Sequence, residues 1–117
     1  MNKKIVIAVA GLSLFVLVGC TKGTPTSNTS NLDDFAKCIT TAGAKIYGTE
    51  TCPHCQNQKA LFDESFQYLN FTDCMKNPNA CEGIDKVPTW EFADGVKEVG
   101  EKTFEQLAEK TNCELAK

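Results

Sequence analysis

Two cysteines three positions apart, Cys52 and Cys55, limit the possible architecture of this chain more than any other feature of its sequence. They stand in the tetrad Cys52-Pro53-His54-Cys55, after a short apolar segment and at the start of a helical pattern. Proline is well suited to the first turn of a helix, and the spacing i, i+3 puts both thiols on one side of that turn. The order strand, cysteine pair, helix is therefore predicted.

The residues before the tetrad predict a helix and a strand. Apolar side chains recur with helical spacing from Leu32 to Ile39, with Asn31 as the expected N-cap and Gly43 beyond the end. The segment Ala44–Gly48 is the expected strand. This strand leads the chain directly to the cysteine pair.

The helix that begins at Pro53 is expected to reach about Phe66, with Ala60, Leu61 and Phe66 facing the core. A strand, a loop, a hairpin and a last helix are predicted after it. These elements are expected at Tyr68–Asp73, at Cys74–Gly83, at Thr89–Val99 around an Asp94-Gly95 turn, and from the capping box of Thr103 and Gln106 onward. The pattern indicates an α/β domain with a mixed sheet of about four strands flanked by helices.

The first 31 residues differ from the rest in composition. Two lysines precede an apolar run over Ile5–Val18, which is shorter than the roughly 18 to 20 apolar residues of a membrane span. The sequence Leu17-Val18-Gly19-Cys20 resembles the lipobox of bacterial lipoproteins, so residues 1–19 are predicted to be a signal peptide and the cysteine after them to carry lipid. Residues 20–31 are then the lipidated cysteine with a flexible polar tether, and 32–117 the folded domain.

Charge and compartment narrow the possible functions. Loss of residues 1–19 removes two of the 12 lysines and none of the 15 acids, so the remaining charge is 10 minus 15, or −5. No nucleic-acid partner is expected from this charge. The expected form is a monomer held at the membrane by its lipid anchor, outside the cytoplasm and facing the periplasm or the cell exterior.

Seven cysteines in 117 residues indicate a disulfide framework in such an exported chain. With one lipidated and two in the tetrad, four remain, and four cysteines allow three connectivities, among which the sequence does not decide. The expected geometry favours one link within the loop after the second strand and one between the first and last helices: Cys74–Cys81 and Cys38–Cys113. A relay in which Cys74 and Cys81 pass electrons from Cys52 is the alternative role for the loop pair.

The tetrad has the residue types that disulfide exchange requires. An attacking sulfur must be partly thiolate and needs a second thiol that resolves the mixed disulfide. Cys52, where the helix dipole favours negative charge, is the expected nucleophile, and Cys55 is the expected resolving thiol. Pro53 fixes the turn between them. His54 would favour the Cys52 thiolate, whereas Glu50 would oppose it.

A metal site is the structural alternative for a pair of this kind. Zinc needs four ligands, but the chain has no second Cys-x-x-Cys, and its one histidine lies inside the first. A zinc site is therefore not expected. Copper bound by Cys52, Cys55 and His54 is the more credible metal hypothesis, and no cofactor is otherwise predicted.

Three segments resemble a known family. Ala44–Gly48, Cys52–Lys59 and Val87–Glu91 closely resemble the thioredoxin-like domain that is fused to, or encoded separately from, bacterial vitamin K epoxide reductase homologues. The resemblance covers about residues 32–115 and implies a compact thioredoxin-like fold. The tetrad also matches that of the oxidising DsbA proteins, although this chain has no room for their helical insertion.

The resemblance implies that Pro88 is cis and faces the cysteine pair, with Val87 offering backbone hydrogen bonds to an extended substrate segment. The sequence departs from the family at two positions. Thr51 stands where the family usually has an aromatic residue, so the apolar surface near the first cysteine is thinner. Ile46 stands where thioredoxins and DsbA proteins carry a buried acid, so the usual proton acceptor for Cys55 is missing.

The favoured hypothesis is an extracytoplasmic thiol–disulfide oxidoreductase. Its Cys52–Cys55 disulfide would oxidise thiols of exported proteins and pass the electrons to a quinone-linked membrane oxidase that resembles vitamin K epoxide reductase. A disulfide reductase or isomerase with the same cysteines is the first alternative. A copper-binding lipoprotein and a purely structural disulfide-rich lipoprotein are the others.

Overall fold

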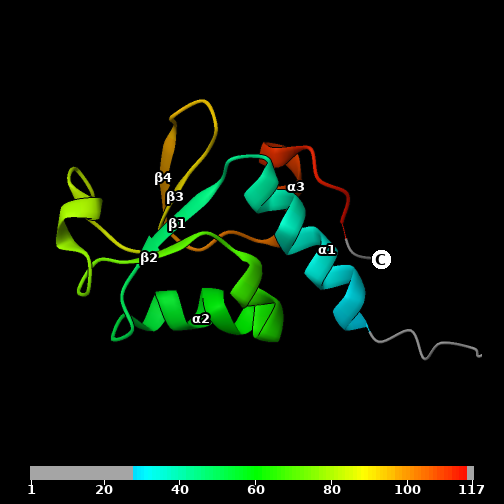
Figure 1. Ribbon diagram of the computed structural model, residues 1–117, viewed down its shortest axis with the longest axis horizontal. Coiled ribbons are helices and arrows are strands. Elements are labelled where there is room, and N and C mark those ends of the chain that lie inside the picture. The colour runs from blue at the N-terminus through cyan, green and yellow to red at the C-terminus, as the bar shows by residue number, and fades with distance from the viewer. Residues whose placement is uncertain (1–27, 116–117) are drawn as a thin grey trace, which may run out of the picture.

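The computed structural model of this chain describes residues 28–115, so the predicted signal peptide, Cys20 and most of the predicted tether lie outside the described range. The described residues form α-helices, short 3₁₀ helices and one four-stranded sheet (Figure 1). The helices are α1 (Asn28–Thr41), α2 (Pro53–Phe62), η1 (Asp63–Tyr68), η2 (Pro78–Cys81) and α3 (Phe104–Thr111). The strands are β1 (Lys45–Gly48), β2 (Phe71–Asp73), β3 (Thr89–Glu91) and β4 (Lys97–Val99).

The sheet has the strand order β2-β1-β3-β4 and is mixed, as the sequence predicts. β1 and β2 are parallel, and the other two pairs are antiparallel. In this register Gly48 lies beside Asp73, Tyr47 beside Thr89, and Thr89 beside Val99. The carboxyl ends of β1, β2 and β4 therefore meet the amino end of β3 at one edge of the sheet, which we call the Gly48 end.

The helices α1, α2 and α3 pack against one face of this sheet. Ile46 and Trp90 are paired on that face and are 1% and 0% exposed. Above them the rings of Phe35, Phe62 and Phe104 lie within 5.0 to 6.4 Å of one another, and they bring the three helices together. Since burial of one such side chain contributes roughly 1.5 to 3 kcal/mol, the three rings together contribute several kcal/mol to stability.

The opposite face of the sheet carries polar side chains. The Tyr47 hydroxyl donates to the Glu91 carboxylate over 3.0 Å, and burial together with that carboxylate raises the pKa of Tyr47. Figure 1 shows the segment after β2, which contains η2, on the side of the sheet away from α1 and α3. No helix among the described residues is long and apolar enough to cross a membrane.

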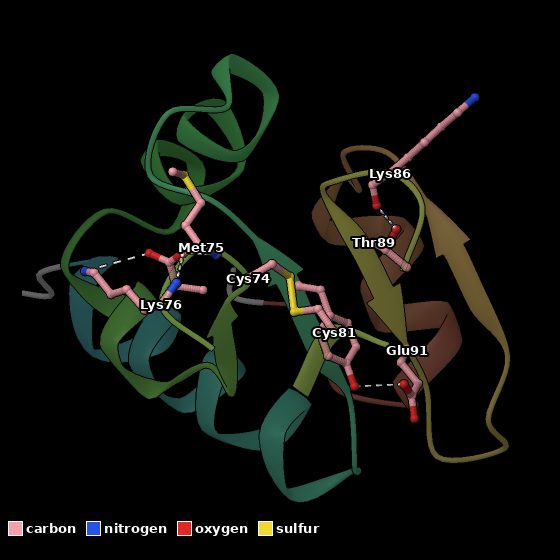
Figure 2. Close-up of a disulfide and its surroundings, with 9 residues drawn as sticks. Cys74, Met75, Lys76, Cys81, Lys86, Thr89 and Glu91 are labelled. Carbon is pink, nitrogen blue, oxygen red and sulfur yellow. Dashed lines mark hydrogen bonds and ion pairs between the residues drawn. A yellow bond between two sulfur atoms is a disulfide. The ribbon is translucent and has the colours of Figure 1, made fainter. Parts of the chain in front are cut away.

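Two disulfides join the elements in the arrangement that the sequence favours. Cys38 on α1 is bonded to Cys113, two residues after α3, with 5.9 Å between their Cα atoms. Cys74 is bonded to Cys81 across η2, with 5.6 Å between their Cα atoms. The first closes the ends of the domain, and the second closes only the short loop after β2 (Figure 2).

Helix α1 begins earlier in the chain than the sequence predicts. The helix begins at Asn28, so Asn31 lies within its first turn, and the prediction that Asn31 is the N-cap was wrong. The predicted tether over residues 20–31 is shortened accordingly. The first four backbone N–H groups of a helix have no intrahelical acceptor. Ser, Thr and Asn, whose side chains compete for backbone hydrogen bonds further along a helix, therefore destabilise its first turn very little.

Helix α2 is shorter than the sequence predicts. Helix α2 ends at Phe62, because Asp63 adopts a positive φ of 48°, and the chain continues as the 3₁₀ helix η1. Ala60 and Leu61 are exposed, so their predicted inward orientation was wrong. The buried face of α2 is formed instead by Cys55, Gln58 and Phe62.

The carboxyl-terminal elements agree more closely with the sequence. The hairpin and its turn are present, and both halves of the predicted capping box are formed between Thr103 and Gln106. The strands are shorter than predicted, and Tyr68 belongs to η1 rather than to β2. Phe66, predicted to face the core, is buried in η1.

Candidate active site

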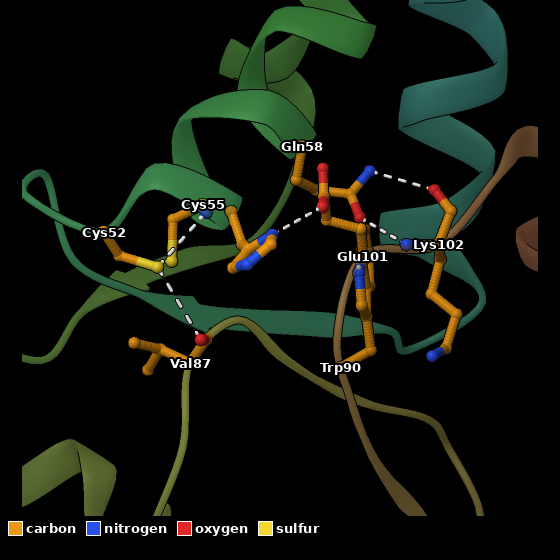
Figure 3. Close-up of polar contacts among 8 residues, drawn as sticks. Cys52, Cys55, Gln58, Val87, Trp90, Glu101 and Lys102 are labelled. Carbon is orange, nitrogen blue, oxygen red and sulfur yellow. Dashed lines mark hydrogen bonds and ion pairs between the residues drawn. The ribbon is translucent and has the colours of Figure 1, made fainter.

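Cys52 and Cys55 lie at the Gly48 end of the sheet, at the start of α2. Cys52 is the N-cap residue, and its sulfur accepts a hydrogen bond from the backbone N–H of Cys55 over 3.3 Å. The Cys52 side chain is partly exposed, whereas Cys55 is only 5% exposed. Both are free thiols in the structure (Figure 3). Of the two sulfurs, only that of Cys52 is open to attack from outside.

The chemistry of the two thiols differs because their environments differ. Burial, together with the hydrogen bond to Cys52, raises the pKa of the Cys55 thiol to about 11. Cys55 therefore stays protonated near neutral pH and is available as a donor to the Cys52 sulfur. A thiolate at Cys52 would accept both this thiol and the Cys55 N–H at the positive end of the α2 dipole.

Gly48 lets Cys55 approach the sheet closely. A Cβ atom at Gly48 would lie 3.1 Å from the Cys55 sulfur and 2.9 Å from the Phe71 ring, so a side chain there would displace one of them. Ile46, two residues earlier on β1, is 1% exposed. Gly48 thus leaves room for the resolving cysteine, and Ile46 supplies no carboxylate to it.

The loop before β3 lies opposite the cysteine pair. The Val87–Pro88 peptide bond is cis, which is the geometry that the family resemblance implies. The Cys52 thiol donates to the Val87 carbonyl over 3.6 Å, and Pro88 accepts from the Gly100 N–H over 2.8 Å. Figure 3 shows the Val87 carbonyl directed at Cys52. The segments at residues 87–88 and 100–102 therefore form one border of the site.

His54 does not have the partner that the sequence predicts. Its Nδ1 atom lies 2.8 Å from the carboxylate of Glu101, and its side chain is 71% exposed. The ring is thus tied to the segment after β4, and among the described residues no hydrogen bond joins it to the Cys52 sulfur. The predicted effect of His54 on the Cys52 thiolate stays a prediction, and the ring lies beside the negative charge of Glu101.

The other border of the site is the turn after β2. Lys76 forms an ion pair of 2.6 Å with Glu50, whose charge was expected to oppose the Cys52 thiolate. Both side chains are more than half exposed, so the pair moderates that charge without adding much stability. Thr51 lies beside Met75, with 3.7 Å between its hydroxyl oxygen and the Met75 sulfur.

Gln58 is a buried polar residue behind the site that the sequence analysis did not identify. Its Oε1 atom accepts from the Trp90 Nε1–H over 3.2 Å and from the Lys102 N–H over 2.7 Å. Its Nε2 atom donates to the Lys102 carbonyl over 3.1 Å. Figure 3 shows this amide between α2 and the segment after β4. Gln58 thus fixes α2 relative to the border that carries Glu101.

Replacement of Gln58 by leucine is expected to destabilise the domain by about 2 to 4 kcal/mol. The substitution leaves the fully buried Trp90 N–H without an acceptor, at a cost of roughly 1 to 3 kcal/mol, and the partly buried N–H and carbonyl of Lys102, which can reach water, add less. Urea unfolding of the oxidised protein measures the loss. Gln67→Leu, at an exposed position of η1, is the matched control and should change stability by less than about 0.5 kcal/mol. Equal stability of the two variants would contradict the structural role of Gln58.

The remaining predicted residues are distributed as follows. Pro53 is the first residue of α2 and is exposed. Both predicted structural disulfides, Cys74–Cys81 and Cys38–Cys113, are formed, and neither includes Cys52 or Cys55. Within residues 28–115, no group of three or more His, Cys, Asp or Glu side chains is arranged to bind a metal ion.

These features define a class of protein. A mixed sheet flanked by helices, a Cys-x-x-Cys pair at the amino end of the helix after β1, and a cis-proline opposite that pair make this a thioredoxin-like domain.

The sequence of this chain is also similar to that of a curated protein. The chain is 36% identical over 91 residues to a thiol-disulfide oxidoreductase of Arabidopsis thaliana. The alignment covers 68% of this chain and 24% of the relative, so the chain spans about a quarter of the length of the protein it matches. No family model matches the sequence.

Proposed function

We propose that this domain is a thiol–disulfide oxidoreductase that oxidises the thiols of exported proteins with a disulfide between Cys52 and Cys55. The observation that carries the proposal is the asymmetry of the pair. Cys52 is exposed enough to react, caps α2 and accepts the Cys55 N–H, whereas Cys55 is buried and has a pKa of about 11. The similarity to a plant thiol-disulfide oxidoreductase supports the same activity.

The proposed reaction has two exchange steps. A substrate thiolate attacks the Cys52 sulfur of the disulfide, the S–S bond breaks, and Cys55 leaves and takes up a proton. A second substrate thiolate then attacks the substrate sulfur of the mixed disulfide and releases Cys52 as a thiolate. The substrate loses two electrons and gains a disulfide, and the cysteine pair holds those two electrons as a thiolate and a thiol.

Two contacts of the reduced pair support the oxidising direction, whereas the donation of the Cys52 thiol to the Val87 carbonyl opposes it. A dithiol becomes harder to oxidise, and its disulfide a stronger oxidant, when the protein stabilises its thiolate. Here the Cys52 sulfur accepts the Cys55 N–H, and the buried Cys55 thiol remains protonated beside it. Ile46 places no buried negative charge on β1 behind the pair.

Reoxidation of the pair requires an acceptor of two electrons. We propose a quinone-linked membrane oxidase that resembles vitamin K epoxide reductase, because the sequence resembles the thioredoxin-like partners of such enzymes. The lipobox ending at Cys20 would hold the domain at the outer side of the membrane. Since α1 begins at Asn28, at most seven residues would separate it from the lipidated cysteine, and a flexible linker of that length would reach roughly 13 to 16 Å. The site would then work close to the membrane.

The reduction potential of the Cys52–Cys55 couple tests the oxidising direction. We expect a midpoint above about −200 mV, in the range of oxidising members of this class, when the protein is equilibrated with glutathione redox buffers and its thiol states are counted by alkylation and mass spectrometry. The double variant Cys74→Ser, Cys81→Ser is the matched control and should give the same midpoint. A value near about −270 mV, that of thioredoxin, would contradict the oxidant and support the reductase alternative.

A further inference from the structure

A short turn after β2 is built rigidly beside the candidate active site. The carboxylate of Asp73, 7% exposed, accepts the N–H of Met75 over 2.9 Å and that of Lys76 over 3.4 Å. The Asn77 N–H closes the turn by donating to the Asp73 carbonyl over 2.8 Å. The Cys74–Cys81 disulfide fixes the other end of the loop. Residues 73–77 are therefore cross-linked by three hydrogen bonds and a disulfide, and we call them the Met75 turn.

The Met75 turn is attached to the segment that leads into Cys52. The Cys74 N–H donates to the Gly48 carbonyl over 2.9 Å, and Lys76 pairs with Glu50. The Met75 sulfur lies 3.7 Å from the Thr51 hydroxyl oxygen. Figure 2 shows the Met75 side chain extending away from the Cys74–Cys81 disulfide toward the ribbon that leads into α2. The thioether thus lies next to the residue that immediately precedes the reactive cysteine.

Met75 is also strongly exposed. With 67% of its surface accessible, it is the most exposed large apolar side chain among the described residues. A single exposed apolar residue has no meaning by itself. Here, however, the polar contacts of its own backbone and of Lys76 place Met75 at the border of the site, where its sulfur accepts the Thr51 hydroxyl over 3.7 Å. A thioether is flexible and polarisable, so it adapts to apolar side chains of different shape.

We propose that Met75 determines part of the substrate specificity of the domain by contacting an apolar side chain next to the reacting cysteine of the substrate. This inference rests on the proposed function. A substrate segment that reaches Cys52 would lie between Val87, whose carbonyl is 3.6 Å from the Cys52 sulfur, and the Met75 turn. Met75 then supplies the apolar surface that Thr51 does not.

The test uses two reduced dithiol peptides that differ only in the residue before the first cysteine, leucine in one and asparagine in the other. Oxidised wild-type protein, Met75→Ala and Leu61→Ala are compared by quenched-flow assay of peptide disulfide. We expect Met75→Ala to lower kcat/KM for the leucine peptide about five- to tenfold and for the asparagine peptide less than twofold. Leu61, 44% exposed at the far end of α2, is the matched control and should change neither.

Three results separate the possible failures. If Met75→Ala slows both peptides equally, or changes neither, Met75 has no role in specificity and the inference is wrong. The rate with reduced glutathione, which has no apolar side chain next to its cysteine, should be unchanged in Met75→Ala, and a loss there would mean that Cys52 itself was perturbed. If the wild-type protein oxidises neither peptide while it reacts with glutathione, the proposed function fails and this inference fails with it.

Discussion

Replacement of Cys52 by serine is expected to lower the rate of substrate-thiol oxidation by at least about a thousandfold. A hydroxyl cannot form the disulfide that accepts the electrons, and the remaining thiol of Cys55 is 5% exposed with a pKa raised to about 11. Loss of a residue that forms the covalent intermediate removes nearly all catalysis. Oxidation of a dithiol peptide, followed by mass spectrometry, measures the rate.

The variant Cys55→Ser is the informative partner of this substitution. It keeps the exposed Cys52 sulfur but lacks the thiol that resolves the mixed disulfide. When it is reduced and presented with a peptide disulfide, it should therefore accumulate a covalent adduct at Cys52 that is visible on a non-reducing gel. Absence of an adduct with Cys55→Ser, together with an adduct in Cys52→Ser, would reverse the roles of the two cysteines.

The loop disulfide provides the control for both variants. The Cys74–Cys81 bond fixes the Met75 turn, on which oxidation of the asparagine peptide is expected to depend little. The double variant Cys74→Ser, Cys81→Ser should therefore retain oxidation of that peptide within a few-fold. If that variant loses activity as completely as Cys52→Ser, these two cysteines are part of the electron path. The relay hypothesis would then replace the structural one.

The sequence was most informative where the structure depends on local patterns. The tetrad predicted the amino end of α2, because the fixed φ of Pro53 suits the first helical position and its missing N–H is not needed there. The Asp94-Gly95 pair predicted the hairpin turn, and Thr103 with Gln106 predicted the start of α3, because each depends on hydrogen bonds across two or three residues.

The contacts at the borders of the site join distant segments, and apart from the cis-Pro88 that the family resemblance implied, the sequence could not show them. His54 and Glu101 are 47 positions apart, and Thr51 and Met75 are 24 apart. They meet because β1, β2 and β4 end at the Gly48 end of the sheet, which only the strand order determines. Nothing near His54 in the sequence indicates that an acid at position 101 will be its partner.

Hydrophobic pattern alone was misleading within α2. Leu61 is apolar and was expected to be buried, but it is 44% exposed, while the polar Gln58 is 1% exposed. The amide is buried because Trp90 and Lys102 satisfy its hydrogen bonds, and neither partner is adjacent to it in sequence. The spacing from Cys55, three positions toward the amino end, was the one local signal that Gln58 shares its inward face.

Removal of the Cys38–Cys113 disulfide is expected to have the largest effect on stability. The bond joins Cys38 on α1 to Cys113, two residues after the end of α3, across a sequence separation of 75. In the loop-entropy account, closing a loop of that length stabilises the folded state by roughly 4.5 kcal/mol. Since small domains are stable by only about 5 to 15 kcal/mol, the double variant Cys38→Ala, Cys113→Ala should be close to its unfolding transition at 37 °C.

Urea and heat unfolding of the oxidised variants measure this effect, with Cys74→Ala, Cys81→Ala as the matched comparison. That pair has a separation of only 7, so its loss should cost roughly 2.5 kcal/mol. The long-loop variant should therefore be the less stable by about 2 kcal/mol. If the order is reversed, the Cys74–Cys81 bond stabilises the native contacts of the Met75 turn more than it restricts the unfolded chain. The loop disulfide would then matter more to the fold than the link between the two terminal helices.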